Sequence, residues 1–319
     1  MLQEKQPELR CVTKMDPIAK SLKQRSLSAK IETRCRLLTQ FCTLLIILLV
    51  LAIFGFIATK GIAIFVQDHG SLVDFFTKTT WAPDQTNIHH RPIIGALPMI
   101  VGSFAVTLLA VVLATPFSLA AAIFMTEISP KRGNKILQPV IELLVGIPSV
   151  VYGFIGLAVI VPAVQKLFGG SGFGILAGTL VLLVMILPTI TSMAVDALKA
   201  VPRHYREASL ALGATRWQTI YKVVLRAAAP GLMTAIIFGM SRAFGEALAV
   251  QMVIGNAALM PSSLASPATT LTSVLTMNMG NTVMGTSANN ALWTLALLLL
   301  IMSLLFNIVI KYLAKRGEL

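Results

Sequence analysis

Two side chains of opposite charge, Arg242 and Glu246, stand four residues apart inside a long apolar run, 227–255. A charge at the centre of a bilayer costs roughly 2.5–3.5 kcal/mol on insertion scales, so such groups point into the protein or towards water. At positions i and i+4 of one helix they would share a face and lie close enough to pair. They either form a structural ion pair, or Arg242 attracts an oxyanion bidentately while Glu246 keeps it from binding too tightly.

The composition shows which environment surrounds these charges. Of the 319 residues, 56% are hydrophobic and 12% are charged, whereas soluble domains carry about 25% charged residues. A bilayer tolerates that much apolar surface and water does not. The formal net charge is +13, but the basic residues form short clusters between apolar runs. We interpret them as membrane-orientation signals and not as a nucleic-acid-binding surface.

Six apolar runs are long enough to cross a bilayer, which takes about 20 residues for about 30 Å of hydrocarbon. We therefore predict an all-α integral membrane protein with about six transmembrane helices. Residues 1–36 are polar and are expected to form a flexible basic tail, and residues 37–319 are expected to form the membrane domain. The spans are expected near 37–58, 95–125, 138–161, 173–195, 227–255 and 290–312.

The positions of Lys and Arg predict the sidedness. The two ends of the chain and the loops after spans two and four carry 21 of the 26 basic residues, and the alternate loops carry four. The positive-inside rule therefore places both termini and these two loops in the cytoplasm. Loop 256–289 has no charged residue and is rich in Ser, Thr, Asn and Met. It is either a plain polar connector, which the sequence favours, or the site of a short gating helix near 268–277. Because no G-x-x-x-x-G-K-[ST] motif occurs, we expect no nucleotide site, and we expect no cofactor or metal in this chain.

The loop after span four, residues 202–225, carries the signals of two short helices. Pro202 can open the first helix, Gly213 can cap its end, and Thr215 with Gln218 forms a capping box for the second. The apolar face of such a hairpin either docks a partner protein or rests on lipid headgroups. That face comprises Leu210, Leu212, Trp217 and Ile220.

Several residues of this hairpin follow a recognisable spacing: Glu207, Ala208, Ser209, Gly213, Val223 and Leu225. The pattern resembles the EAA loop of ABC importer permeases, which has Glu-Ala-Ala, then Gly four residues after the second Ala, and Ile-x-Leu-Pro ten residues later. Here Ser209 replaces the second Ala and Arg226 stands in place of the Pro. The resemblance implies a type I ABC importer permease fold, in which the loop, with Trp217 on its second helix, docks onto an ATPase subunit.

Two further stretches narrow the family. Residues 141–153 resemble the third helix of phosphate importer permeases, and residues 242–256 resemble the fifth helix of the PstC-type subunit. The resemblance implies that Arg242 and Glu246 take part in transport. A Glu142 side chain that merely extends to the interface fits the sequence equally well. The candidates in the helix-three motif are Glu142, Pro148, Ser149 and Tyr152.

The resemblance implies a subunit that carries inorganic phosphate across the cytoplasmic (inner) membrane without hydrolysing ATP itself. The implied partners are an ATPase subunit dimer that uses ATP, a second homologous permease (PstA-like), an extracytoplasmic phosphate-binding protein and the lipid bilayer. Two alternatives stay open. One is a permease for another oxyanion, molybdate or sulfate. The other, less favoured, is an ion-gradient-driven secondary transporter, a class that often has inverted repeats.

Overall fold

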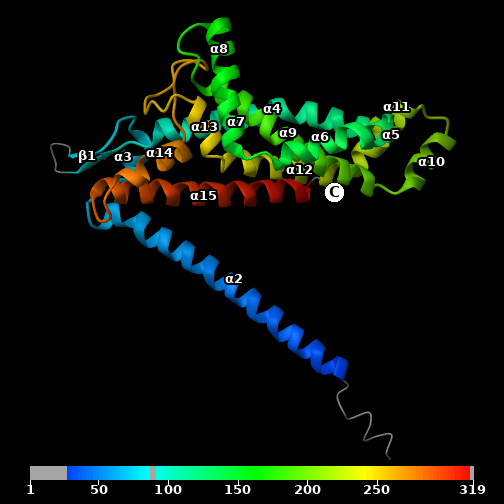
Figure 1. Cartoon of the computed structure of the whole chain (residues 1–319), viewed down its shortest axis with the longest axis horizontal. Coiled ribbons are helices and arrows are strands. Elements are labelled where there is room, and N and C mark those ends of the chain that lie inside the picture. The colour runs from blue at the N-terminus through cyan, green and yellow to red at the C-terminus, as the bar shows by residue number, and fades with distance from the viewer. Residues whose placement is uncertain (1–26, 87–90, 317–319) are drawn as a thin grey trace, which may run out of the picture. The chain divides into compact units, whose positions relative to one another are not determined.

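The computed structural model of the chain describes residues 27–86 and 91–316 (Figure 1). Six helical stretches in this part of the chain are long and apolar enough to cross a membrane. This confirms the predicted all-α membrane protein with six spans. The stretches are Ile31–Val66, Leu97–Ile128, Ser149–Phe168, Ile175–Ala200, Arg216–Phe244 and Ser287–Ile308.

The first helix, α2 (Leu27–Val66), begins earlier than predicted. Residues 27–36, which we assigned to a flexible tail, are helical, because helix formers such as Leu27 and Ala29 continue the run towards the N-terminus. The rest of the predicted tail, residues 1–26, lies outside the described residues. The chain divides by its contacts into two units, Met1–Phe56 and Ile57–Leu319, and the second unit contains the remaining elements.

A small cap follows α2 at one end of the second unit. It consists of the short helix α3 (Leu72–Thr77) and an antiparallel strand pair, β1 (Trp81–Thr86) and β2 (Pro92–Ile94). Phe75 of α3 is buried in an apolar cluster that also contains residues of α15 (Ser287–Arg316). The cap lies at the end of this unit opposite to the hairpin formed by α10 (Arg203–Ala211) and α11 (Arg216–Thr219) (Figure 1).

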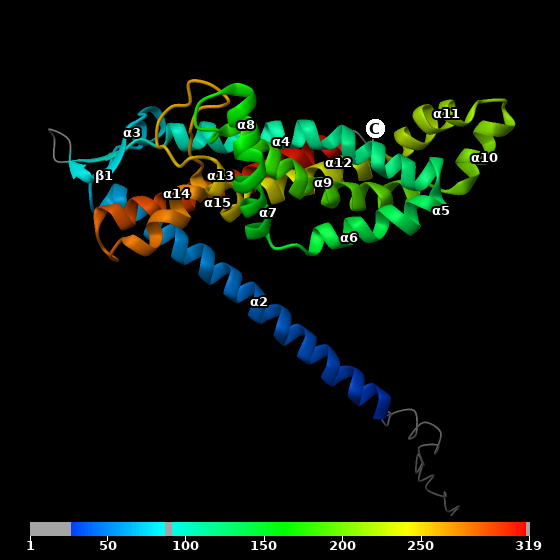
Figure 2. The ribbon, with the colours of Figure 1, turned by 45° about the horizontal axis from the view of Figure 1, so that its top comes forward.

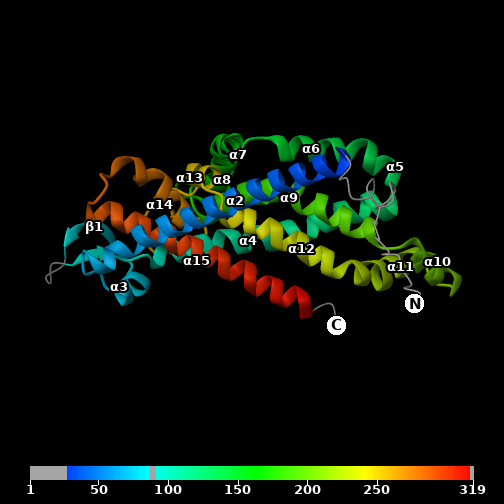
Figure 3. The ribbon, with the colours of Figure 1, turned by 90° about the horizontal axis from the view of Figure 1, so that it is seen from below.

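Three long helices form the centre of the second unit: α4 (Leu97–Ile123), α9 (Ile175–Ala200) and α12 (Leu225–Phe244). They lie side by side along the unit (Figure 2). A Cβ on Gly239 of α12 would come within 2.4 Å of Ile190 of α9, so only glycine permits this close approach. Helix α15 packs against α12 (Figure 3). Pro116 lies inside α4 and does not end it. The helix runs on into a π-helical turn at Phe124–Ile128.

The predicted third span, 138–161, is two helices instead of one. Helix α6 (Gln138–Gly146) is preceded by α5 (Pro130–Arg132) and the turn Gly133–Leu137, and it ends before Pro148. Helix α7 (Ser149–Ile155) then continues through Gly156–Ile160 into α8 (Val161–Phe168). Ile147 and Pro148 are extended, because proline disfavours helical backbone in the residue before it and lacks the N–H a continuing helix needs. The membrane-length stretch is therefore Ser149–Phe168.

The predicted fifth span, 227–255, differs at both of its ends. The second hairpin helix, α11 (Arg216–Thr219), runs through Ile220–Val224 directly into α12, so the span begins within the predicted hairpin. Helix α12 ends at Phe244, and residues 248–253 form a separate helix, α13 (Leu248–Val253).

The loop after α13 is not the plain connector we expected. It contains the helix α14 (Leu271–Asn278), followed by a single tight turn at Met279–Asn281. The side chain of Thr270 accepts a hydrogen bond from the N–H of Ser273, and the side chain of Ser273 accepts one from the N–H of Thr270. This capping box starts a helix close to the range 268–277, where the sequence offered a short helix as the less favoured alternative.

Candidate functional site

The first helix of the hairpin is α10 (Arg203–Ala211). Pro202 is its N-cap residue, and Gly213 follows its C-terminal end. The N–H of Gly213 donates to the carbonyl of Leu210 at 3.0 Å, and the N–H of Ala214 donates to that of Ser209 at 3.2 Å. These two bonds form a Schellman motif, which requires left-handed backbone at Gly213, where φ is +83°. The predicted C-terminal cap is therefore present.

The second hairpin helix starts with the predicted capping box. The N–H of Gln218 donates to Thr215 Oγ1 at 3.2 Å, and the N–H of Thr215 donates to Gln218 Oε1 at 2.9 Å. A hydroxyl pair then ties the two helices together, since Ser209 Oγ and Thr219 Oγ1 lie 2.9 Å apart. Ser209 is the residue that departs from the Glu-Ala-Ala pattern, and this bond gives its hydroxyl a structural role.

The hairpin exposes most of its predicted docking residues. Leu212 at the tip is 89% exposed and Trp217 is 63% exposed. Glu207 and Ala208 are exposed on α10. Ile220, which we assigned to the same apolar face, is buried instead, because it faces the bundle from the start of the fifth span. The outer surface of the hairpin is thus open to a partner.

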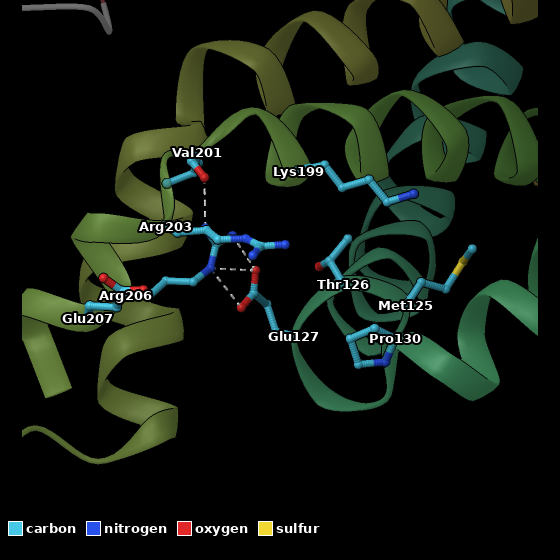
Figure 4. A pocket seen from close by; sticks show the side chains of 9 residues that line it. All are labelled: Met125, Thr126, Glu127, Pro130, Lys199, Val201, Arg203, Arg206 and Glu207. Carbon is cyan, nitrogen blue, oxygen red and sulfur yellow. Dashed lines mark hydrogen bonds and ion pairs between the residues drawn. The ribbon is translucent and has the colours of Figure 1, made fainter.

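The base of the hairpin is held by an ion pair that the sequence analysis did not identify. Arg206 Nη2 lies 2.6 Å from Glu127 Oε1, and Arg206 Nε donates to Glu127 Oε2 at 3.1 Å. The same guanidinium donates to the carbonyl oxygens of Val201 and Leu198, at 2.8 Å and 3.0 Å. A cavity of about 620 Å³ adjoins the pair (Figure 4). It is lined by Met125, Thr126, Glu127, Pro130, Lys199, Val201, Arg203, Arg206 and Glu207.

Arg242 and Glu246 do not form the predicted helical pair. Helix α12 ends at Phe244, so the i, i+4 geometry of a continuous helix does not extend to Glu246. Arg242 Nη1 instead donates to Thr189 Oγ1 at 3.0 Å. Glu246 Oε1 accepts the N–H of Ala249 at 3.1 Å, close to the start of α13. Of the ion pairs in the described part of the chain, none joins Arg242 to Glu246.

The helix-three candidates surround the break at Pro148. The buried Tyr152 donates its hydroxyl to the carbonyl of Leu144 at 2.7 Å, where α6 ends. The same carbonyl also accepts the N–H of Ile147 at 3.4 Å. Tyr152 also lies close enough to Arg242 for an electrostatic interaction. Ser149 is half-buried at the start of α7. Glu142 is separate: it is exposed on α6 and accepts a hydrogen bond from Gln138 Nε2 at 2.8 Å.

Hydroxyl side chains line a small pocket together with Glu246, just beyond the end of α12. Thr272 Oγ1 donates to the carbonyl of Glu246 at 2.9 Å, and Ser103 Oγ accepts the N–H of Leu271 at 2.9 Å. A Cβ on Gly102 would lie 2.0 Å from the carbonyl oxygen of Thr269, so α4 and this loop are in direct backbone contact. These bonds fix the polar segment before α14 against the bundle. Sequence reasoning noted its Ser and Thr content but had no signal for its partners.

Comparison with known proteins agrees with this geometry. Residues 114–318 match the family described as binding-protein-dependent transport system inner membrane component. A probable ABC transporter permease protein of Bacillus subtilis, YqgH, is 53% identical over 90% of this chain and 92% of its own length. The phosphate transport system permease protein PstC of Mesorhizobium japonicum is 32% identical over 76% and 78%. PstC 1 of Mycobacterium tuberculosis is 34% identical over 76% and 81%.

Solved structures support the fold. A chain of the MetNI methionine ABC transporter, in an inward facing conformation, aligns with a TM-score of 0.53 at 21% identity. The alignment covers 70% of this chain and 94% of that chain. These relatives are transport components and not enzymes. The chain therefore belongs to the family of binding-protein-dependent transport system inner membrane components, as a multi-pass ABC importer permease subunit similar to the PstC proteins.

Proposed function

We propose that this chain translocates inorganic phosphate across the cytoplasmic membrane with energy from separate ATPase subunits. Support for the substrate comes first from the relatives, since PstC proteins of several bacteria, which their names describe as phosphate transport permeases, match between 63% and 76% of this chain. Membership of an ABC importer family leaves no reason to retain the ion-gradient-driven alternative. Molybdate and sulfate stay as rival substrates.

The observation in the chain that carries the proposal is the environment of Arg242. Its guanidinium has five N–H donors, and Thr189 accepts the one side-chain hydrogen bond it makes among the described residues. No carboxylate in the described part of the chain pairs with it. An uncompensated charge within a span costs roughly 2.5–3.5 kcal/mol, and a tetrahedral oxyanion offers oxygens that match the remaining donors bidentately.

Glu246 is the second pathway residue of the proposal. It follows the end of α12, and its carboxylate accepts the N–H of Ala249. A fixed negative charge near the anion path keeps phosphate from binding Arg242 too tightly to leave. Tyr152, near Arg242, and Pro148 belong to the neighbouring helix break, which gives this part of the bundle a hinge for alternating access.

The exposed hairpin is the proposed docking site for the ATPase subunits. Glu207 presents a charged surface, Ala208 a small apolar one and Trp217 an aromatic one. Gly213 sets the turn between the two helices. The positive-inside rule puts this hairpin in the cytoplasm. A second, PstA-like permease would complete the pathway, and an extracytoplasmic phosphate-binding protein would deliver phosphate at the opposite end, beside the cap and α14.

Phosphate uptake by an Arg242→Gln variant tests the proposal. The complete complex is reconstituted in proteoliposomes, with ATP inside and loaded binding protein outside. Arg242→Gln should abolish accumulation of ³²P-phosphate while complex assembly and basal ATPase activity persist. The matched control is Arg226→Gln, an exposed arginine on the same helix, which should transport normally. Normal uptake by Arg242→Gln would remove this residue from the pathway.

Competition with unlabelled oxyanions tests the substrate. Excess phosphate should suppress ³²P-phosphate uptake, whereas equal concentrations of sulfate or molybdate should leave it unchanged. Suppression by molybdate or sulfate, together with ATP-dependent uptake of that ion, would assign the chain to the rival substrate.

A further inference from the structure

The first hairpin helix, α10, is joined to the bundle by side-chain contacts as well as by the continuous backbone. On its C-terminal side the hairpin continues through α11 into α12 without a break. On its N-terminal side, Arg206 of α10 reaches two other helices: it pairs with Glu127, just beyond α4, and it donates to Leu198 and Val201 at the end of α9. One guanidinium therefore joins α10, α4 and α9.

All three guanidinium nitrogens of Arg206 donate hydrogen bonds. Nε donates to both oxygens of Glu127, Nη2 donates to Glu127 and Leu198, and Nη1 donates to Val201. The Leu198 and Val201 carbonyls lie at the C-terminal end of α9, where a cation is favoured. The Leu198 carbonyl also accepts the N–H of Val201, at 3.4 Å. A lysine ammonium cannot reproduce this planar arrangement.

Burial makes the pair costly to separate. The Arg206 side chain is 22% exposed and that of Glu127 is 10% exposed. Removing one partner would leave the other charge largely out of water, which is far less favourable than keeping both. Arg206 and Glu127 therefore move together when α10 moves.

We propose that the Arg206–Glu127 pair is the link that transmits displacement of the docking hairpin to spans two and four. Span five receives the motion through the continuous α11–α12 helix, and the pair carries it to α4 and α9. Arg206 is a positioning residue, since it touches no substrate. The transport role of the link rests on the proposed function, but its mechanical role does not.

A double-mutant cycle tests the transport role. In the reconstituted complex, Arg206→Ala, Glu127→Ala and the double variant should each lower the phosphate transported per ATP hydrolysed about tenfold, within the usual range of coupling between sites. The double variant should be no worse than either single variant, because both remove one link. Arg206→Lys should also fail. Lys199→Ala, which removes an exposed cation from the same cavity, should behave as the wild type.

Independent effects of the two alanine substitutions, which multiply in the double variant, would contradict a shared link. So would wild-type stoichiometry in Arg206→Lys, because it would show that charge alone suffices. A wild-type complex that hydrolyses ATP without moving phosphate would instead count against the proposed substrate. The mechanical role of the Arg206–Glu127 pair would then be tested by the label distances described next.

Distances between nitroxide labels test the mechanical role without reference to substrate. One label is placed at Leu212 on the hairpin and one at the exposed Phe117 on α4, in a complex whose native cysteines have been replaced. In the wild type the distance distribution should be narrow and should not change between nucleotide-free and ATP–vanadate-trapped states. In Arg206→Ala and Glu127→Ala it should broaden and shift on trapping. An unchanged narrow distribution in both variants would overturn the proposal.

Discussion

Substitutions at Gly213 test whether the hairpin turn needs glycine for its left-handed backbone or for lack of space for a side chain. Gly213 has φ +83°, and nothing lies within 4 Å of the position a Cβ would occupy. A side chain there would meet no neighbour, so its cost is conformational. Left-handed backbone costs an ordinary residue about 1–2 kcal/mol and asparagine less. Gly213→Ala should therefore lower the population of the native turn by a factor of about 5 to 30.

Proline at position 213 should have a larger effect than alanine. Its ring fixes φ near −65° and it has no N–H. The bond from the Gly213 N–H to Leu210 would be lost, which alone costs about 1 kcal/mol, and the second hairpin helix would leave in a different direction. The affinity for the ATPase subunit and the rate of coupled uptake should both decrease in the order Gly, Asn, Ala, Pro for the residue at position 213.

The assay is the dissociation constant of the purified ATPase subunit for the permease complex, with ATP-driven uptake measured on the same samples. Gly170→Ala is the matched control, because Gly170 also has positive φ, +72°, and open space around it, but lies in the loop after α8. It should leave docking unchanged. Equal losses from alanine and proline at position 213, or an equal loss from Gly170→Ala, would refute the backbone explanation.

Two further predictions concern neighbouring side chains. Trp217→Ala removes an aromatic group that is 63% exposed. As the loss of a docking hot spot, this substitution should weaken binding of the ATPase subunit by about 2 kcal/mol and leave the thermal stability of the solubilised permease unchanged. Unchanged affinity would favour contact of Trp217 with lipid headgroups. Tyr152→Phe removes the hydroxyl donor to the Leu144 carbonyl at the helix break. That carbonyl keeps the N–H of Ile147 as a partner, so thermal unfolding should show a loss of about 0.5–1.5 kcal/mol, whereas Tyr221→Phe on the exposed hairpin should show none.

Local signals in the sequence predicted the hairpin well. The capping box joins Thr215 to Gln218, three residues apart, and the left-handed turn depends on the single residue Gly213. Both are short-range relations that residue types reveal directly. Their presence explains why the two hairpin helices, and the exposure of Trp217 and Leu212, could be predicted without knowledge of packing.

Contacts between distant segments could not be predicted in this way. Arg206 and Glu127 are 79 residues apart, and Ser103 and the N–H of Leu271 are 168 apart. Each residue type is common at helix ends, so its partner is defined only by packing. The break after α12 was also missed: apolar residues precede Gly245 (Ala243 and Phe244) and follow Glu246 (247–250), so the pattern gave no stop signal. The expected Arg242–Glu246 pair assumed a helix that does not continue.

Phosphate accumulation by the complete complex tests the central claim most directly. Proteoliposomes that contain this chain, its partner permease and the ATPase subunits are given ATP inside and phosphate-loaded binding protein outside. We predict ³²P-phosphate uptake against its gradient that depends on ATP and disappears with Arg242→Gln. ATP hydrolysis stimulated by the binding protein without any phosphate accumulation would contradict the account.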